Sequence, residues 1–301
     1  MVEAHDASKR FAAKGDWDTA QARRLISGGV QREYWIAKPS AAGGKTLPIV
    51  LLLHGGTQTA QDVWEQTSLP TLAQSQGFIL AAPQGIAKHW NDGRGSTIAG
   101  DAASTADDVR FLREVVQRLV LEEGGDARSV FVIGASNGGF MAMRLACEGG
   151  DLLRAGANVI SNLPAAQARG CASRKPLPWL SMNGVKDPII PFAGQAEGTL
   201  QRGQPQPALL SADATFAFWA DRAGCPATVT TQAISKTVQK RTRSGCSGGT
   251  RSEQYVFAEA GHVWPGLAIT RPLASYWIGG TNLDVDTGAA AWAFFSATLA
   301  R

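Results

Sequence analysis

SVFVIGASNGGF, residues 129–140, is the stretch from which the architecture of this 301-residue chain can be predicted. Its first five residues are mostly apolar and β-branched or aromatic, which predicts a buried strand. Gly134 to Gly138 then spell G-x-S-x-G, and a helix-like run follows from Gly139 to Cys147. Glycines let a chain bend sharply enough to expose a serine between a strand and a helix, an arrangement called a nucleophile elbow. We therefore predict that Ser136 is a nucleophile on a strained turn.

Strand-like and helix-like segments alternate on both sides of this turn. Residues 48–53 (PIVLLL) form a continuous apolar run, typical of a central strand covered on both faces. Residues 104–123 carry apolar positions at three- and four-residue spacing, which predicts an amphipathic helix capped by Ser104 or Thr105. Other expected strands are 31–37 (an edge strand), 78–82, 157–160, 178–183, 227–235 and 252–258, and other expected helices are 59–76, 212–223 and 288–299. This alternation favours an α/β fold with a mostly parallel central sheet and helices on both faces.

The chain length suits one large α/β domain, and 44% hydrophobic residues are ample for its core. Residues 1–27 have few apolar positions in any period, so we expect a weakly structured N-terminal lead-in. Residues 28–301 contain no repeat, linker or second core pattern. We therefore expect them to form a single catalytic domain.

A serine hydroxyl becomes a strong nucleophile only beside a base, and that base needs an acid to orient it. In chains with this kind of elbow, the acid and then the histidine follow the serine. His262 is the only histidine downstream of Ser136, and it is the predicted base. Asp187 follows the predicted strand 178–183, at the kind of edge where open sheets bind ligands, and it is the predicted acid. The alternative for Asp187 is a turn aspartate beside a proline.

Backbone N–H groups are expected to form an oxyanion hole beside the nucleophile. One donor is Asn137, the residue after the serine. The other is expected in the loop His54-Gly55-Gly56-Thr57, where Gly56 and Thr57 are both candidates. His54 itself is expected to brace this loop rather than to transfer protons.

None of the four cysteines has the C-x-x-C spacing of a zinc or redox site. Two disulfides are expected, and of the three possible connectivities the sequence-adjacent pairs Cys147–Cys171 and Cys225–Cys246 are favoured; the alternative is four reduced, buried thiols. Disulfides indicate an oxidising compartment, so we expect a secreted or periplasmic protein. Because the N-terminus MVEAHDASKR lacks a hydrophobic leader, we expect that a signal peptide was removed and that Met1 is an expression start. A full gene without such a leader would contradict this.

The 29 basic and 25 acidic residues give a net charge of only +4, and the basic ones are scattered. The one local run, KTVQKRTR at 236–243, is interpreted as a solvated face rather than a nucleic-acid patch. No run approaches the ~20 apolar residues that span a bilayer. We expect no nucleic-acid partner, no membrane span, no metal and no cofactor, and no motif indicates an oligomeric state.

Six short stretches, in consistent order over residues 28–300, resemble a known family, the polyhydroxybutyrate depolymerase and feruloyl esterase group of secreted α/β-hydrolases. They are LHGGTQTAQDVW (53–64), HWNDGRG (89–95), DDVRFL (107–112), GASNGGFMAMRLACE (134–148), NGVKDPIIPF (183–192) and GHVWPG (261–266). The resemblance implies the α/β-hydrolase fold, with Ser136 as nucleophile, Asp187 as acid and His262 as base. It also implies disulfides in the same two cysteine pairs.

The chain departs from the family pattern at residues 194–210 and 266–282, which are expected to wall the acyl pocket. Residues 194–210 are rich in Gly, Gln and Pro and are expected to form a mobile insertion. Trp90, Trp264 and Trp277 fall on loops near motif positions, where a flat aromatic wall would suit a cinnamoyl ring or a polyester chain. The alternative is that each tryptophan fills the core or braces a loop.

The leading hypothesis is a secreted serine esterase that acts on feruloyl or other aryl esters, or on short hydroxyalkanoate oligomers, through an acyl-enzyme. Its partner would be a small-molecule or oligomeric ester. Acetyl-polysaccharide esterase or acyltransferase activity on the same triad is the enzymatic alternative. A non-catalytic binding protein on a hydrolase scaffold is the alternative of another class, and it would be expected to have lost one of the three residues.

Overall fold

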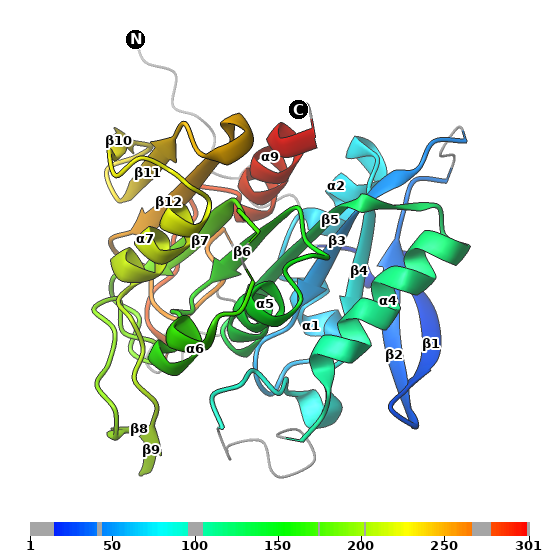
Figure 1. Ribbon diagram of the computed structural model, residues 1–301, viewed down its shortest axis with the longest axis horizontal. Helices are drawn as coiled ribbons and strands as arrows, with labels where there is room; N and C mark the ends of the chain where they lie inside the picture. The colour runs from blue at the N-terminus through cyan, green and yellow to red at the C-terminus, as the bar shows by residue number, and fades with distance from the viewer. Residues whose placement is uncertain are drawn as a thin grey trace.

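A computed structural model describes residues 15–40, 44–95, 105–173, 175–201, 203–266 and 278–299. Within these ranges one large sheet of ten strands spans the molecule (Figure 1). Its strand order is β1-β2-β4-β3-β5-β6-β7-β12-β11-β10. In that order the strands are Gln21–Ser27, Val30–Ala37, Ile79–Pro83, Leu47–Leu53, Gly125–Ala135, Ala155–Val159, Trp179–Gly184, Arg251–Phe257, Val238–Ser244 and Thr230–Ala233.

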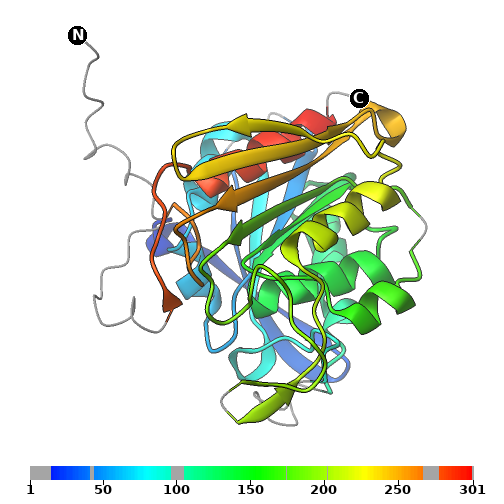
Figure 2. The ribbon, with the colours of Figure 1, turned by 90° about the vertical axis from the view of Figure 1, so that its left-hand side faces the viewer.

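The strands from β4 to β12 in this order are all parallel to one another, and antiparallel strands extend the sheet at both edges. The predicted mostly parallel sheet is thus confirmed. Because parallel strands point the same way, the carboxyl ends of β3, β5, β7 and β12 lie at one edge of the sheet (Figures 1 and 2). Residues that follow these four strands can therefore meet.

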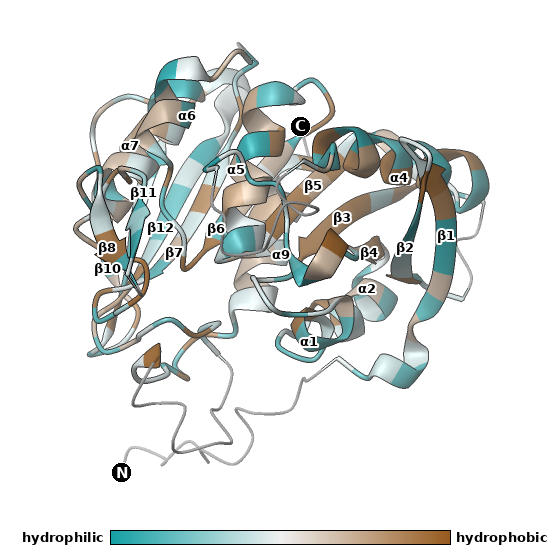
Figure 3. Ribbon diagram, turned by 90° about the horizontal axis from the view of Figure 1, so that it is seen from below, coloured by the Kyte–Doolittle hydropathy of each residue, from teal (hydrophilic) through white to brown (hydrophobic). Residues whose placement is uncertain are grey.

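The central strands are apolar on both faces because each face is covered by helices. On β3, Ile49, Leu51 and Leu53 pack in a core with α4 (Asp108–Glu122) and α5 (Asn137–Glu148). Val50 and Leu52 pack in a second core with α1 (Ala60–Trp64), α2 (Leu69–Gln76) and α9 (Thr287–Leu299). Figure 3 shows β3 and β5 as hydrophobic strands between these layers. No described helix is long and apolar enough to cross a membrane. Two further described α-helices are α6 (Ala165–Gly170) and α7 (Ala212–Arg222).

Two of the predicted helices differ from the observed ones. The helix expected over 59–76 is broken into α1 and α2, because Pro70 stands in the first turn of α2, where its missing N–H and fixed φ are tolerated but cannot continue an earlier helix. The helix α4 begins after Asp107, whose side chain accepts the N–H of Arg110 at 3.0 Å. The predicted caps were thus placed too early, and Ser104 lies outside the described residues.

The N-terminal edge of the sheet corrects two expectations. Residues 21–27, assigned by sequence to a weakly structured lead-in, form β1 and pair antiparallel with β2 through the turn Gly28–Gly29. Consequently β2 is not an edge strand. One face of β1 is exposed, so the strand needs few apolar residues, and Arg23 is held by Glu123 at 2.6 Å. Residues 1–14 lie outside the described residues.

The strand β11 is missing from the sequence-based prediction because it lies mostly within the basic run 236–243. Lys240 pairs with Glu253 of β12 at 3.0 Å, and Arg241 pairs with Asp213 of α7 at 2.7 Å. As consecutive strand residues, Lys240 and Arg241 point to opposite faces of the sheet, and each is stabilised there by an acidic partner. The run is therefore an ion-paired strand of the sheet and not simply a solvated face.

The insertion at residues 194–210 contains a small hairpin, β8 (Thr199–Gln201) and β9 (Gln204–Gln206), which projects from the body of the molecule (Figures 1 and 2). Its base is closed by mutual backbone hydrogen bonds between Gln195 and Leu209, at 3.1 and 3.0 Å. The side chain of Gln201 donates to the carbonyl of Ile189 at 2.8 Å. The hairpin is thereby attached to the loop that carries Asp187.

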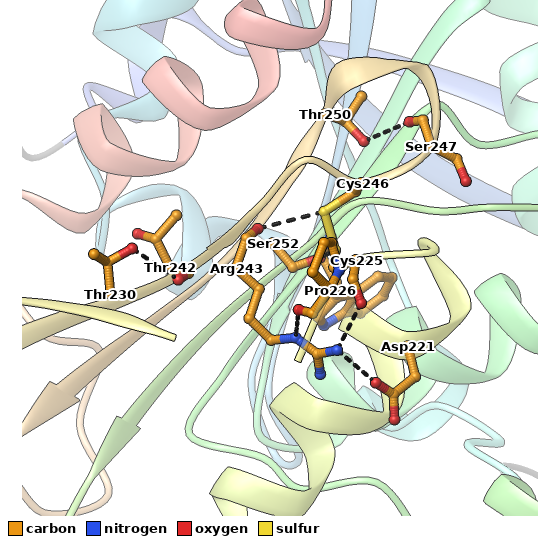
Figure 4. Close-up of a disulfide and its surroundings, with 11 residues drawn as sticks. Asp221, Cys225, Pro226, Thr230, Thr242, Arg243, Cys246, Ser247, Thr250 and Ser252 are labelled. Atoms are coloured by element: carbon orange, nitrogen blue, oxygen red, sulfur yellow. Dashed lines mark hydrogen bonds and ion pairs between the residues drawn. A yellow bond between two sulfur atoms is a disulfide. The ribbon is translucent and has the colours of Figure 1, made fainter. Parts of the chain in front are cut away.

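Both predicted disulfides are present. Cys147 at the end of α5 joins Cys171 after α6, and Cys225 after α7 joins Cys246 after β11. Figure 4 shows the second one beside Arg243, whose guanidinium donates to the carbonyl of Cys225 at 2.7 Å. With sequence separations of 24 and 21 residues, each crosslink is expected to stabilise the fold by about 3 kcal/mol in the chain-entropy description.

Candidate active site

Ser136 occupies the sharp turn between β5 and α5. Its backbone has φ 52° and ψ −119°, a conformation that is costly for a residue with a Cβ. The turn is fixed because the Ser136 N–H donates to the carbonyl of Val159 at 2.9 Å and its carbonyl accepts the N–H of Phe140 at 3.0 Å. The strained turn expected from the sequence is therefore formed.

The glycines around Ser136 are required by close backbone contacts. A Cβ on Gly134 would lie 2.2 Å from the carbonyl oxygen of Gly138, and a Cβ on Gly138 would lie 2.4 Å from that of Leu53. A Cβ on Gly139 would lie 2.1 Å from the hydroxyl of Ser161. Only glycine allows α5 to start this close to β3, β5 and the end of β6.

Three side chains from three loops form a continuous hydrogen-bond chain. His262 Nε2 lies 2.9 Å from Ser136 Oγ, and His262 Nδ1 lies 2.8 Å from Asp187 Oδ2. The Asp187 side chain is 2% exposed and that of His262 is 11% exposed, so the carboxylate is enclosed while the imidazole reaches the surface. The structure brings together the three residues that the sequence singles out.

Backbone contacts hold the Asp187 loop in place. Asp187 Oδ1 accepts the N–H groups of Ile189 and Ile190, both at 2.8 Å, which leaves Oδ2 directed at the histidine. The loop is joined to the strand end before His262 because the Lys186 N–H donates to the carbonyl of Ala260 at 3.0 Å. The carboxylate and the imidazole are thus supported by neighbouring strand ends.

This arrangement defines the roles of the two ring nitrogens. A carboxylate can only accept, so Nδ1 of His262 carries the hydrogen that is donated to Asp187. Nε2 then has a free electron pair directed at the Ser136 hydroxyl, which donates to it. An imidazole in this tautomer can take the hydroxyl proton while the carboxylate stabilises the resulting positive charge.

The three candidate oxyanion donors are not equivalent. Asn137 begins α5, so its N–H lies at a helix N-terminus next to Ser136. The N–H of Thr57 donates to the carbonyl of Lys88 at 2.9 Å, and an amide has a single hydrogen. Thr57 is therefore a poor candidate, contrary to the expectation that left it open. A Cβ on Gly56 would lie 3.6 Å from the Cβ of Asn137, so Gly56 is the candidate beside the turn.

Of the three tryptophans proposed for the pocket, the two that the structure describes lie in the interior. Trp90 is 3% exposed and its indole N–H donates to the carbonyl of His54 at 2.9 Å, which favours the bracing role over a pocket wall. Trp264 is 2% exposed and packs in the core beside α9, and its indole N–H has no hydrogen-bond partner within the described part of the chain. Both indoles are thus almost fully enclosed. Trp277 lies outside the described residues.

His54 is a fully buried brace of the loop that follows β3. Its Nε2 accepts the N–H of Gly85 at 2.9 Å, so Nδ1 must carry the hydrogen, which it donates to the carbonyl of Gly55 at 2.8 Å. Burial lowers the pKa of His54 from 6.5 to about 4, with a smaller lowering contribution from His89 and from Arg32. The imidazole is therefore neutral at physiological pH, as a bracing role requires.

This pKa predicts an acid-sensitive fold. As pH falls below 6.5, His54 binds a proton in the unfolded chain, whereas the folded protein resists protonation down to about 4. The stability supplied by the neutral ring is complete above pH 6.5 and is lost as pH falls through 4, by about 3 kcal/mol. Urea unfolding at pH 7 and pH 4 should show this loss, and the difference should be smaller by that amount in His54→Gln. An identical pH dependence in both proteins would contradict the assignment.

Sequence reasoning pointed to the loop that contains Trp90 but missed its role in holding Asn137. Asp92 in this loop is 3% exposed and accepts the side-chain N–H of Asn137 at 2.6 Å. The motif HWNDGRG was visible in the sequence, but nothing in it indicated which residue Asp92 would bind. Among the described residues, no group of three or more His, Cys, Asp or Glu could hold a metal ion. A surface groove of about 610 Å³ along α4 contains none of the predicted site residues.

Comparisons with known proteins show similarity to esterases. No family model matches the chain. It is 29% identical to "Putative esterase NocK" of Nocardia uniformis subsp. tsuyamanensis over 89% of this chain and 80% of that protein. It is 26% identical to feruloyl esterase B of Piromyces equi over 61% of this chain and 34% of that protein. It is also 30% identical to the poly(3-hydroxybutyrate) depolymerase of Ralstonia pickettii over 47% of this chain and 31% of that protein.

Among solved structures, the acetyl xylan esterase from Aspergillus awamori aligns with a TM-score of 0.57 and 15% identity over 86% of this chain and 99% of that one. At this identity the likeness concerns the fold. The chain has the α/β-hydrolase fold, which confirms the predicted fold class. The predicted similarity to feruloyl esterases and to a polyhydroxybutyrate depolymerase is confirmed as well. The chain spans only about a third of the length of the Piromyces equi and Ralstonia pickettii proteins.

Proposed function

We propose that this protein is a serine esterase that hydrolyses carboxylic esters through an acyl-enzyme, with Ser136, His262 and Asp187 as its catalytic triad. The proposal rests on the hydrogen-bond chain from the Asp187 carboxylate through His262 to the Ser136 hydroxyl, at 2.8 and 2.9 Å. The sequence relatives support it, because carboxylic ester hydrolysis is the reaction that their names share. The strained turn at Ser136 supports it too, because such strain is typical of functional positions.

In the proposed reaction, Ser136 Oγ attacks the ester carbonyl carbon while His262 Nε2 takes the hydroxyl proton. The tetrahedral intermediate collapses, the C–O bond to the alcohol breaks, and His262 returns the proton to the departing alcohol. Water then attacks the acyl-enzyme with His262 again acting as base, which releases the acid and restores the serine. Asp187 remains ionised and stabilises the imidazolium in both halves.

We assign the oxyanion hole to the backbone N–H groups of Asn137 and Gly56. Negative charge on the carbonyl oxygen develops only in the tetrahedral species, so donors held in advance lower the barrier without tightening the ground state. The position of Asn137 at the start of α5 adds the positive end of the helix dipole.

The proposed substrates are feruloyl or other aryl esters, short hydroxyalkanoate oligomers or acetylated polysaccharide, all soluble or oligomeric esters. Initial rates on methyl ferulate, hydroxybutyrate oligomers and acetylated xylan test the proposal, with enzyme inactivated by a fluorophosphonate as the blank. We expect hydrolysis of at least one of the three, and the ratio of rates identifies the substrate class. Failure to cleave any of them, together with failure on a nitrophenyl ester, would contradict esterase activity.

We also propose that the sheet and its helices form one catalytic domain that works outside the cytoplasm. The shared sheet supports the first point, since a single sheet carries all three triad residues. The two disulfides support the second, because such bonds persist in oxidising compartments.

A further inference from the structure

The loop Trp90–Arg94, in which Trp90 and Asp92 are buried, contacts both sides of the proposed oxyanion hole. Its main chain pairs with the Asn137 side chain, because the Trp90 N–H donates to Asn137 Oδ1 at 2.7 Å and the Asn137 amide donates to the Trp90 carbonyl at 3.1 Å. The indole of Trp90 reaches the other side, where it donates to the carbonyl of His54 at 2.9 Å. One residue is thus hydrogen-bonded both to Asn137 and to the residue two positions before Gly56.

A buried carboxylate completes the attachment to Asn137. Asp92 Oδ2 accepts the Asn137 amide at 2.6 Å and two N–H groups of the Arg94 guanidinium, at 2.9 and 2.7 Å. Asp92 Oδ1 accepts the Arg94 main-chain N–H at 3.0 Å. The guanidinium itself lies over the ring of Phe140 on α5, at 3.8 Å. The Asp92 charge is therefore paired and the loop is packed onto the first turn of α5.

The Asn137 side chain thus makes three hydrogen bonds to the loop Trp90–Arg94. Bonds that fix the Asn137 side chain also restrict movement of the main chain to which it is attached. This matters because the Asn137 N–H must point at the carbonyl oxygen of the substrate to be useful. The His54 carbonyl and the rings of His54 and Trp90, 4.9 Å apart, restrict the opposite loop in the same manner.

We propose that Trp90 and Asp92 are positioning residues that hold the two oxyanion donors, Asn137 and Gly56, at a fixed separation. This inference rests on the proposed esterase function. The residues contact no substrate; they act through the peptide groups of their neighbours. Rigid donors matter because catalysis depends on hydrogen bonds that are aligned before the reaction begins, and a misplacement of about 1 Å is costly.

The test uses Trp90→Phe, which keeps an aromatic ring but removes the bond to the His54 carbonyl, and Asp92→Asn, which removes the charge. Trp179→Phe is the matched control: Trp179 is equally buried, its indole N–H donates to Asn158 at 2.7 Å, and it lies at the amino end of β7, opposite the site. Turnover of a nitrophenyl ester is expressed per active site, counted by titration with a fluorophosphonate.

We expect kcat per titrated site to fall about tenfold in both loop variants, with KM within about twofold of the original, because only transition-state bonds are weakened. The inhibition constant of a boronic acid, whose tetrahedral adduct places an oxygen in the hole, should rise by the same factor. The Trp179→Phe control should keep both values.

A fall in activity that disappears once rates are counted per titrated site would show a purely structural role and would overturn the inference. An equal loss in Trp179→Phe, or an unchanged boronic acid constant, would do the same. If the unaltered protein fails to react with the fluorophosphonate, the esterase proposal itself fails, which is a different outcome from unchanged kinetics in the variants.

Discussion

Replacing Ser136 by alanine should lower kcat for a nitrophenyl ester by about 10⁴- to 10⁶-fold, because triad members act as a unit and removal of the nucleophile eliminates the acyl-enzyme route. Among the described residues, the hydroxyl has one hydrogen-bond partner, His262 Nε2 at 2.9 Å. Its loss opens no cavity in the core, so the unfolding midpoint should change little. Steady-state kinetics and urea unfolding of the same preparation measure both effects.

Ser75→Ala provides the control for this prediction, since Ser75 is an exposed serine on α2 and far in sequence from any triad residue. It should retain the original turnover. Turnover by Ser136→Ala within about tenfold of the original would mean that another group performs the chemistry, because no oxyanion hole alone supplies that much of the rate.

Gly138→Ala should lower the free energy of unfolding by about 3 kcal/mol or more, and ester turnover with it. The added Cβ would lie 2.4 Å from the carbonyl oxygen of Leu53 and 2.5 Å from that of His54. Both are backbone atoms at the end of β3, so they cannot move aside without shifting the loop that carries Gly56. Urea unfolding monitored by tryptophan fluorescence measures the loss.

Gly170→Ala is the matched control for this change. Gly170 ends α6, and a Cβ there would meet no atom of the described residues within 4 Å. Alanine is also the better helix former, so stability should be unchanged or slightly higher. Equal losses from Gly138→Ala and Gly170→Ala would show that the cost comes from losing a glycine in general and not from crowding at the elbow.

Local patterns predicted the parts of the fold that depend on neighbours in sequence. The elbow is encoded by a strand, a glycine-flanked serine and a helix within one dozen residues, and the apolar runs locate the central strands because those strands are buried on both faces. The pairing of Ser136 with His262 followed from there being one downstream histidine, so elimination replaced geometry.

Features that depend on distant partners could not be predicted in this way. The strand β11 is made of charged residues whose partners, such as Asp213, come from another element. Thr57 and Gly56 look equivalent in sequence, and only the bond from the Thr57 N–H to Lys88 separates them. The sequence placed Trp90 on a loop near the site, but it could not indicate that the indole N–H donates to the His54 carbonyl.

Mass spectrometry of the protein after reaction with a fluorophosphonate shows whether Ser136 is an activated nucleophile. We predict one probe per chain, carried by the peptide that contains Ser136, with ester hydrolysis lost in proportion to labelling and labelling strongly slowed in His262→Ala. Full ester hydrolysis in a protein whose Ser136 stays unlabelled, or a probe attached to a different residue, would contradict it.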